Sequence, residues 1–174
     1  MKTWKTITIN KKPSTEGIQI SDWAEDMLKK VKWNKKQRID LVRITVGELF
    51  NDTNLHTTDE IYAKAKKKGL SLCPPQVGLQ LRVDYKDQPM NEWLYMGMKP
   101  ITDSYGGPHV FKLGRRDGGL WLYSIWANPG NAWHPLHEFV FSLRKSLKLK
   151  PLDPSSDTYI KCKECKGTGY IKYE

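Results

Sequence analysis

Two stretches of the chain repeat apolar residues with the 3.6-residue period of an amphipathic helix. The first begins near Asp22 and Glu25, a helix-start signal, and its apolar residues fall on one stripe. These residues are Trp23, Ala24, Met27, Leu28 and Val31. The second stretch begins at Thr57, which can form a capping box with Glu60, and ends in three lysines before Gly69. The pattern predicts two helices in the N-terminal half.

Other segments alternate apolar and polar residues with the two-residue period of a strand. Short strands are expected at 6–9 and 41–46. From residue 79 onward the alternating segments are separated by Gly- and Pro-containing turns, one of which, at 116–119, is a hairpin signal. The predicted strands cover 79–85, 93–98, 110–113, 120–126 and 139–143; of these, 79–85 alternates throughout, and 120–126 is apolar on both faces, as in a central strand. The predicted fold class is α+β: two N-terminal helices and a short strand segment followed by an antiparallel β-meander of about five strands, which can curl into a small barrel.

Composition sets the expected domain organisation. The chain has 174 residues, of which 39% are hydrophobic and seven are Trp, so it can bury a core without disulfides. After the last alternating segment the sequence becomes rich in Pro, Ser and charge with few apolar residues. We therefore expect one α+β domain at 1–145, a linker at 146–157, and a tail at 158–174.

Several classes of protein are disfavoured by the sequence. Three Cys residues do not make a disulfide framework, and no apolar run approaches the length of a membrane span. The residues after Met1 do not form the apolar region of a signal peptide. These observations predict a cytoplasmic protein with no membrane partner.

The formal net charge of +10 favours an acidic partner, of which nucleic acid is the commonest. Aromatic residues also crowd the predicted strands: Trp93, Trp121, Trp126, Trp133, Tyr85, Tyr95 and Tyr123. Rings on a sheet can stack bases while neighbouring cations hold phosphates. The predicted nucleic-acid-binding residues are Arg82, Lys112, Arg115, Arg116, Trp93 and Trp121. The alternative interpretation is that the charge is a solvated surface and that most of these rings pack in the core.

The tail contains a possible metal site. Residues 162–170 read C-x2-C-x-G-x-G-Y, which resembles one repeat of the zinc-binding modules of Hsp40-type chaperones. Cys162 and Cys165 supply two thiolates, whereas structural Zn²⁺ takes four ligands. His134 and His137, Cys73, or the same pair from a second chain could complete the site. The alternative is a reduced dithiol without a metal.

No catalytic motif is present: the sequence has no nucleophile elbow, P-loop, dinucleotide fingerprint or H-E-x-x-H. Cys73 is interpreted as a buried small hydrophobe rather than as a nucleophile. Carboxylates near the turns of the meander could form an acid–base pair, although turn chemistry alone accounts for several of them. They are Asp84, Asp87, Glu92, Asp103 and Asp117. We expect a protein that is not an enzyme and has no catalytic residues.

From Trp4 to about Arg144 the chain resembles a family of small bacterial proteins that has no assigned activity. The matching stretches include ISDWAEDML, IDLVRITVGEL, TTDEIYAKAKKKGLSLCPPQVGLQLRVDYKDQP, EWLYMGMKPITDSYGGPHVF, GLWL and HEFVFSLR. The chain departs from the family pattern at 50–56 and after Ser146. The resemblance implies one evolutionary unit and no particular function.

Three functions are consistent with these patterns. The leading hypothesis is a non-enzymatic binding protein that engages nucleic acid or a ribonucleoprotein through basic surface. The first alternative is a protein-binding module or inhibitor that uses exposed aromatics and the C-terminal zinc knuckle. The second alternative is a small hydrolase with carboxylates at the turns of the meander.

Overall fold

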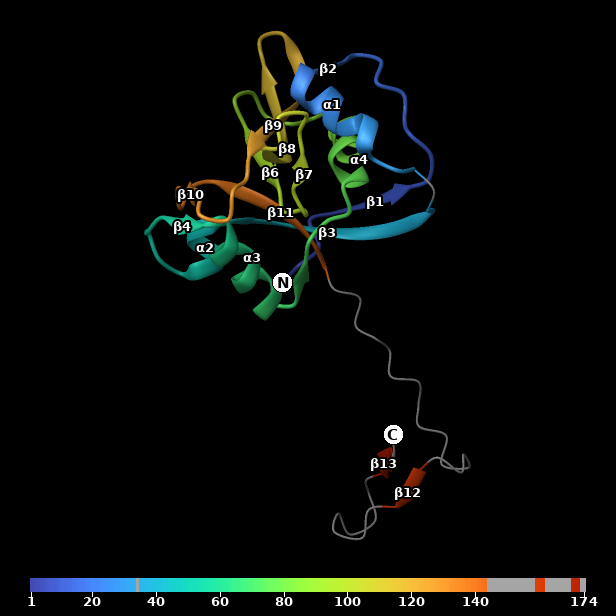
Figure 1. Cartoon of the computed structure of the whole chain (residues 1–174), viewed down its shortest axis with the longest axis vertical. Coiled ribbons are helices and arrows are strands. Elements are labelled where there is room, and N and C mark those ends of the chain that lie inside the picture. Colours follow the sequence, from blue (N-terminus) through green and yellow to red (C-terminus); the bar gives the residue numbers. More distant parts are fainter. Residues whose placement is uncertain (34, 144–158, 162–169, 173–174) are drawn as a thin grey trace. The chain divides into compact units, whose positions relative to one another are not determined.

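The computed structural model describes residues 1–33 and 35–143, together with the backbone of 159–161 and 170–172 (Figure 1). The chain divides into two compact units, Met1–Arg144 and Lys145–Glu174. In the second unit, β12 (Tyr159–Lys161) pairs with β13 (Tyr170–Lys172) in an antiparallel ladder. The predicted linker at 146–157 and the two cysteines of the tail lie outside the described residues.

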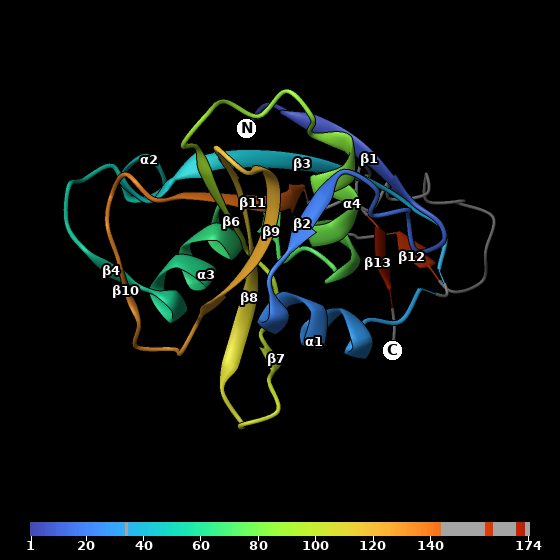
Figure 2. The same ribbon diagram turned by 90° about the horizontal axis from the view of Figure 1, so that it is seen from above.

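The first unit is built on a curled, mixed sheet with the strand order β1-β3-β11-β6-β8-β9-β2 (Figure 2). In that order the strands are Lys5–Ile9, Gln37–Thr45, Glu138–Leu143, Trp93–Met96, Pro108–Arg116, Gly119–Trp126 and Ile18–Ile20. Neighbours are antiparallel except for two parallel pairs, β11 with β6 and β2 with β9. The short strands β5 (Leu70–Ser71) and β7 (Ile101–Thr102) add to β11 and β8. A separate pair joins β4 (His56–Thr57) to β10 (Ala132–Trp133).

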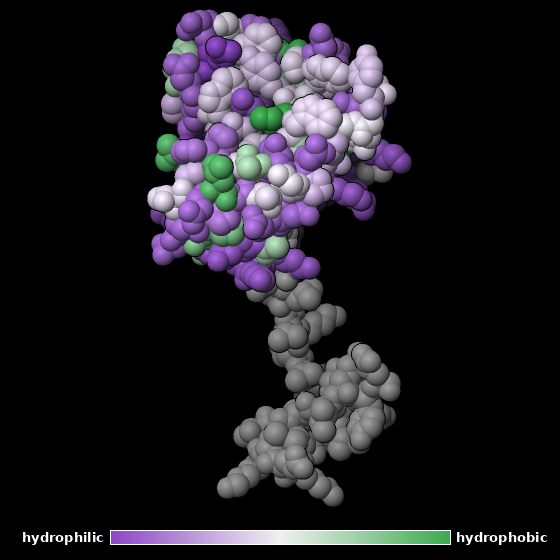
Figure 3. Space-filling view, turned by 60° about the vertical axis from the view of Figure 1, so that its left-hand side comes forward, coloured by the Kyte–Doolittle hydropathy of each residue, from purple (hydrophilic) through white to green (hydrophobic). Residues whose placement is uncertain are grey.

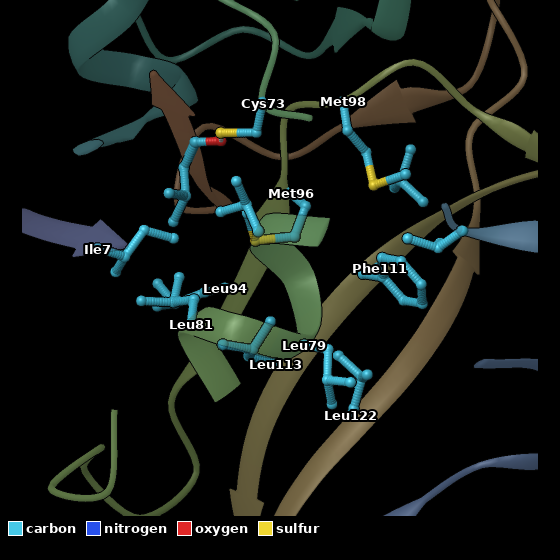
Figure 4. Close-up of a cluster of buried hydrophobic side chains, with 14 of the residues drawn as sticks. Ile7, Cys73, Leu79, Leu81, Leu94, Met96, Met98, Phe111, Leu113 and Leu122 are labelled. Carbon is cyan, nitrogen blue, oxygen red and sulfur yellow. Dashed lines mark hydrogen bonds between the residues drawn. The ribbon is translucent and has the colours of Figure 1, made fainter. Parts of the chain in front are cut away.

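Four helices among the described residues cover the two faces of this sheet. They are α1 (Asp22–Lys30), α2 (Val46–Phe50), α3 (Thr58–Lys67) and α4 (Gln76–Asp84). One core lies between the sheet and the helices α1 and α4; Figure 4 shows Leu79 and Leu81 of α4 beside Met96 and Leu113 of the sheet. The other core packs α2 and α3 against the opposite face, through Phe139 among other residues. No helix in the described part of the chain is long and apolar enough to cross a membrane.

The helix predicted from the capping box at Thr57 is confirmed as α3. The Thr57 hydroxyl accepts a hydrogen bond from the Glu60 amide at 3.3 Å, and the Glu60 carboxylate accepts one from the Thr57 amide at 2.8 Å. Both bonds satisfy amide groups that a helix start leaves without partners.

Replacing Thr57 with alanine is expected to lower the free energy of unfolding by about 1 kcal/mol, because the Glu60 amide loses its acceptor. Urea denaturation measures the change. Thr53→Ala, at an exposed position three residues before β4, is the matched control and should change stability by less than about 0.5 kcal/mol. An equal effect of both substitutions would contradict the role given to the cap.

The prediction of an α+β protein is confirmed, but two of its details are wrong. Residues 79–85, predicted as a strand, belong mostly to α4, which follows Pro74 and Pro75. Proline suits the first turn of a helix, so this pair was the missed signal. The sheet is also not a simple meander, because β11 inserts between β3 and β6 and pairs with β6 in parallel. The short helix α2 was not predicted.

Candidate nucleic-acid interface

Six residues of β6, β8 and β9 form a half-exposed strip on one face of the sheet, which we call the outer strip. Its members are Trp93, Lys112, Gly114, Arg116, Trp121 and Tyr123. The strand register places them together, since Trp93 and Trp121 both lie opposite Gly114, and Tyr123 lies opposite Lys112. Directly opposed residues of an antiparallel pair share a face. Gly114 is buried, Arg116 is exposed, and the remaining four are half-buried.

The aromatic rings of the outer strip contact one another. Trp121 and Tyr123 stack with their ring centroids 5.0 Å apart and their planes within 10°. Tyr123 also lies 5.6 Å from Trp93. Trp93 packs directly against the sheet backbone, because a Cβ on Gly114 would come within 2.3 Å of its ring. The glycine therefore lets a large ring lie close over the strand.

Two cations lie over the Trp93 ring of the outer strip. Lys112 Nζ is 3.7 Å from the centroid of Trp93, and the Arg116 guanidinium is 5.9 Å from the same centroid. Burial lowers the pKa of Lys112, and the neighbouring charge of Arg116 lowers it further. None of the six residues is acidic, so two cations share this face without a carboxylate among them. A bound anion would relieve their mutual repulsion.

Figure 3 brings the side of the molecule that carries β4 and β10 forward. Pale residues, whose hydropathy is intermediate like that of Trp and Tyr, gather over the upper part of the first unit between strongly hydrophilic ones. Exposed lysines also occur elsewhere, at Lys29 and Lys30 in α1 and at Lys66 and Lys67 in α3. The positive charge is therefore not confined to the outer strip.

Four of the six predicted nucleic-acid-binding residues meet in the outer strip, and two do not. Arg82 is fully buried in α4, so it cannot contact a ligand at the surface and is withdrawn from the set. Arg115 faces away from the strip, as the alternation of β8 requires, and its Nη1 donates to the Gln88 carbonyl at 2.9 Å. Tyr123 was noted only as an aromatic, although its alternation with Trp121 placed both on one face.

Most of the other aromatic residues are buried, as expected if these rings pack in the core. Trp133, Tyr85 and Tyr95 are buried, whereas Trp126 is exposed. Trp133 donates from Nε1 to the Thr58 hydroxyl at 2.8 Å, which satisfies its only polar group.

The histidines considered as zinc ligands are next to each other. The His134 amide donates to His137 Nδ1 at 3.2 Å, and His137 packs against Tyr95 with centroids 5.0 Å apart. Burial lowers the pKa of His137, as do His134 and Lys112 nearby. Within residues 1–33 and 35–143 no group of three or more His, Cys, Asp or Glu side chains is arranged to hold a metal. Cys162 and Cys165 lie outside the described residues, so zinc binding by the tail stays a prediction.

Cys73 is a buried small residue, as predicted. Its Sγ lies 3.6 Å from the Val140 carbonyl oxygen, and burial raises the pKa of its thiol far above the usual range (Figure 4). A thiol in this environment stays protonated and is a poor nucleophile.

The carboxylates considered for a hydrolase do not form a pair. Asp84, Asp87 and Asp117 are exposed on separate elements. Glu92 is bound to Arg43, with Oε1 2.5 Å from Nη2. The carboxylate of Asp103 is buried in the turn before β8 and lies beside His109.

Comparison of the chain with protein-family models, with curated proteins and with solved structures finds no match. The family resemblance noted from the sequence therefore stays a prediction.

Proposed function

We propose that this protein binds nucleic acid and that the outer strip holds unpaired bases. The proposal depends on one observation: stacked aromatic rings and two cations share one face of an antiparallel sheet segment. Bases stack on aromatic rings with little sequence preference, and they can do so only where they are not paired in a duplex. A single-stranded segment or a loop, free or within a ribonucleoprotein, is therefore the expected ligand.

The residues of the outer strip have two roles in this proposal, base stacking and phosphate binding. Trp121 and Tyr123 provide ring faces for bases, while Lys112 and Arg116 lie within reach of the phosphates between them. The Lys112 ammonium and the Arg116 guanidinium both lie over the ring of Trp93. The net charge of +10 would attract a polyanion from a distance, and the outer strip would then fix its position.

The test is the binding of a fluorescent single-stranded 12-mer, followed by anisotropy at several salt concentrations. Trp121→Ala should weaken binding about tenfold, because base–ring stacking contributes about 1–3 kcal/mol. Arg116→Ala should weaken binding and also reduce the slope of log K against log salt by about 0.7, the value for one lost phosphate contact on a single strand.

Two controls separate the outer strip from general charge and apolar surface. Lys67→Ala removes an exposed cation of α3, and Leu136→Ala removes an apolar side chain that is 78% exposed. Neither should change affinity more than about twofold. Absence of binding at low salt, or equal effects of Lys67→Ala and Arg116→Ala, would refute the proposal.

A further inference from the structure

A hollow of about 650 Å³ lies between α1, the turn after β7 and the end of β9. Figure 2 shows α1 and β7 side by side at this position. The hollow is lined by Trp23, Asp103, Tyr105, His109, Ser124, Ile125 and Trp126. It shares none of its residues with the outer strip.

Three of the lining side chains are large aromatic residues that the fold leaves in contact with solvent. Trp23 is 45% exposed, Trp126 is 52% exposed and Tyr105 is 85% exposed. The rings form a chain around the hollow: Tyr105 lies 5.5 Å from Trp23, Trp23 lies 5.9 Å from His109, and His109 lies 5.2 Å from Trp126, between centroids. Exposed aromatic rings gathered around one concavity are typical of a binding site.

The buried polar side chains of the hollow are Asp103 and His109, while Ser124 and Tyr105 add hydroxyl groups to its lining. Asp103 Oδ1 accepts hydrogen bonds from the amides of Gly107 at 2.7 Å and Tyr105 at 2.8 Å, and Oδ2 lies 3.0 Å from His109 Nε2. Oδ1 is thus satisfied within the turn, whereas Oδ2 faces the His109 ring on β8. Neither ring nitrogen of His109 makes a hydrogen bond of good geometry within the described chain, although both are buried and Nε2 lies close to Asp103 Oδ2. Buried polar atoms rarely lack a partner, so the imidazole indicates a missing one.

The charge of the hollow differs from that of the whole molecule. Although the chain carries a net charge of +10, no Lys or Arg of the described residues lines the hollow. Burial alone would raise the pKa of Asp103, but hydrogen bonds from the amides of Gly107 and Tyr105, and the neighbouring His109, bring it below the usual range. The carboxylate is therefore ionised at neutral pH. A negative charge beside several ring faces attracts cations.

We propose that this hollow is a second binding site, which takes a methylated ammonium cation such as a trimethylammonium group. A primary ammonium would need three oxygen acceptors around one point, whereas Asp103 Oδ1 already accepts two amides and three of the lining side chains are exposed aromatic rings. A methylated cation needs no acceptors and gains from contact with ring faces, as in other aromatic cages. His109 Nδ1 remains for one donor elsewhere on the ligand, such as a hydroxyl.

The test uses choline as the probe, titrated into the full chain and followed by tryptophan fluorescence and calorimetry. Saturable binding is expected. The neutral isostere 3,3-dimethyl-1-butanol, which has the same shape without the charge, should bind at least tenfold more weakly. Trp126→Ala and Trp23→Ala should each weaken choline binding at least fivefold, since each removes a ring face.

Asp103→Asn keeps an oxygen acceptor for the turn but removes the charge, and it should also weaken choline binding at least fivefold. Because Asp103 is buried, the folding of the Asp103→Asn variant is checked by circular dichroism. If that variant unfolds, the two Trp variants, which are changed at exposed positions, still test the proposal. Leu136→Ala is the control and should leave choline binding unchanged. Equal binding of the neutral isostere, or saturation by adenosine or glucose but not by choline, would overturn the assignment.

Discussion

Replacing Arg82 with alanine is expected to lower the free energy of unfolding by about 3–5 kcal/mol. The side chain is fully buried, although charged residues are rarely found in cores. Its guanidinium donates to the Gln88 side-chain oxygen, to the Tyr85 carbonyl and, at 3.3 Å, to the Gly114 carbonyl. Alanine would leave three acceptors without a donor and open a cavity between α4 and the sheet.

The surroundings of Arg82 explain why the loss should be large. None of its hydrogen-bond partners is a carboxylate, and burial lowers the pKa of Arg82 to about 10. The positive charge of Arg82 is therefore stabilised by neutral oxygen atoms that accept hydrogen bonds from its guanidinium. Gln88 is itself fixed, since its Nε2 donates to the Glu92 carbonyl at 3.1 Å. The network joins α4 to the loop before β6 and to β8.

Urea denaturation of Arg82→Ala and Arg116→Ala provides the measurement and its control. Arg116 is an exposed arginine on β8, so its removal should change stability by less than about 0.5 kcal/mol. A loss below about 1 kcal/mol for Arg82→Ala would show that the buried network contributes little.

The second large effect is expected for Gly97→Ala, which should destabilise the protein by about 2–3 kcal/mol. Gly97 follows β6; its amide donates to the Val140 carbonyl at 2.9 Å and its carbonyl accepts from the Cys73 amide at 2.7 Å. A Cβ at this position would lie 2.2 Å from Cε1 of Phe141, which is fully buried. Neither the backbone nor the ring has room to move away.

Gly130→Ala is the matched control for Gly97→Ala, because nothing lies within 4 Å of a Cβ at Gly130. Thermal or urea unfolding should separate the two variants clearly. Equal stability of the Gly97→Ala and Gly130→Ala variants would contradict this prediction, because it would mean that Phe141 repacks without loss of folding free energy.

The sequence predicted elements well where the signal was local. The capping box at Thr57 and the hairpin turn at 116–119 are set by neighbouring residues, and the structure has both. Helix α4 was missed because Val77, Leu79, Leu81 and even Arg82 are buried around most of its circumference. A helix buried on several sides shows no amphipathic period, so the chance alternation of 79–85 resembled a strand.

The outer strip could be predicted in part, for the same reason. The turn at Asp117-Gly118 fixes the register of β8 and β9, and alternation then places Lys112, Trp121 and Tyr123 on one face. Arg115 should have been excluded by that alternation. The hollow beside α1 could not be predicted, because Trp23, His109 and Trp126 come together only through the packing of separate elements. Asp103 was considered as a turn residue and as one of several carboxylates for an acid–base pair. The amides of Tyr105 and Gly107 donate to it, as a turn residue requires, but its contact with His109 could not be predicted.

The place of β11 in the sheet has a consequence for biosynthesis. The strand runs from Glu138 to Leu143 and separates β3 from β6, two strands made much earlier. While the ribosome is still translating the region before residue 138, the half with β1 and β3 and the half with β6, β8 and β9 have no ladder between them, and each exposes an unpaired edge. Such edges attract other chains, and contacts between distant residues form slowly. The sheet therefore becomes continuous only when this six-residue strand docks between β3 and β6.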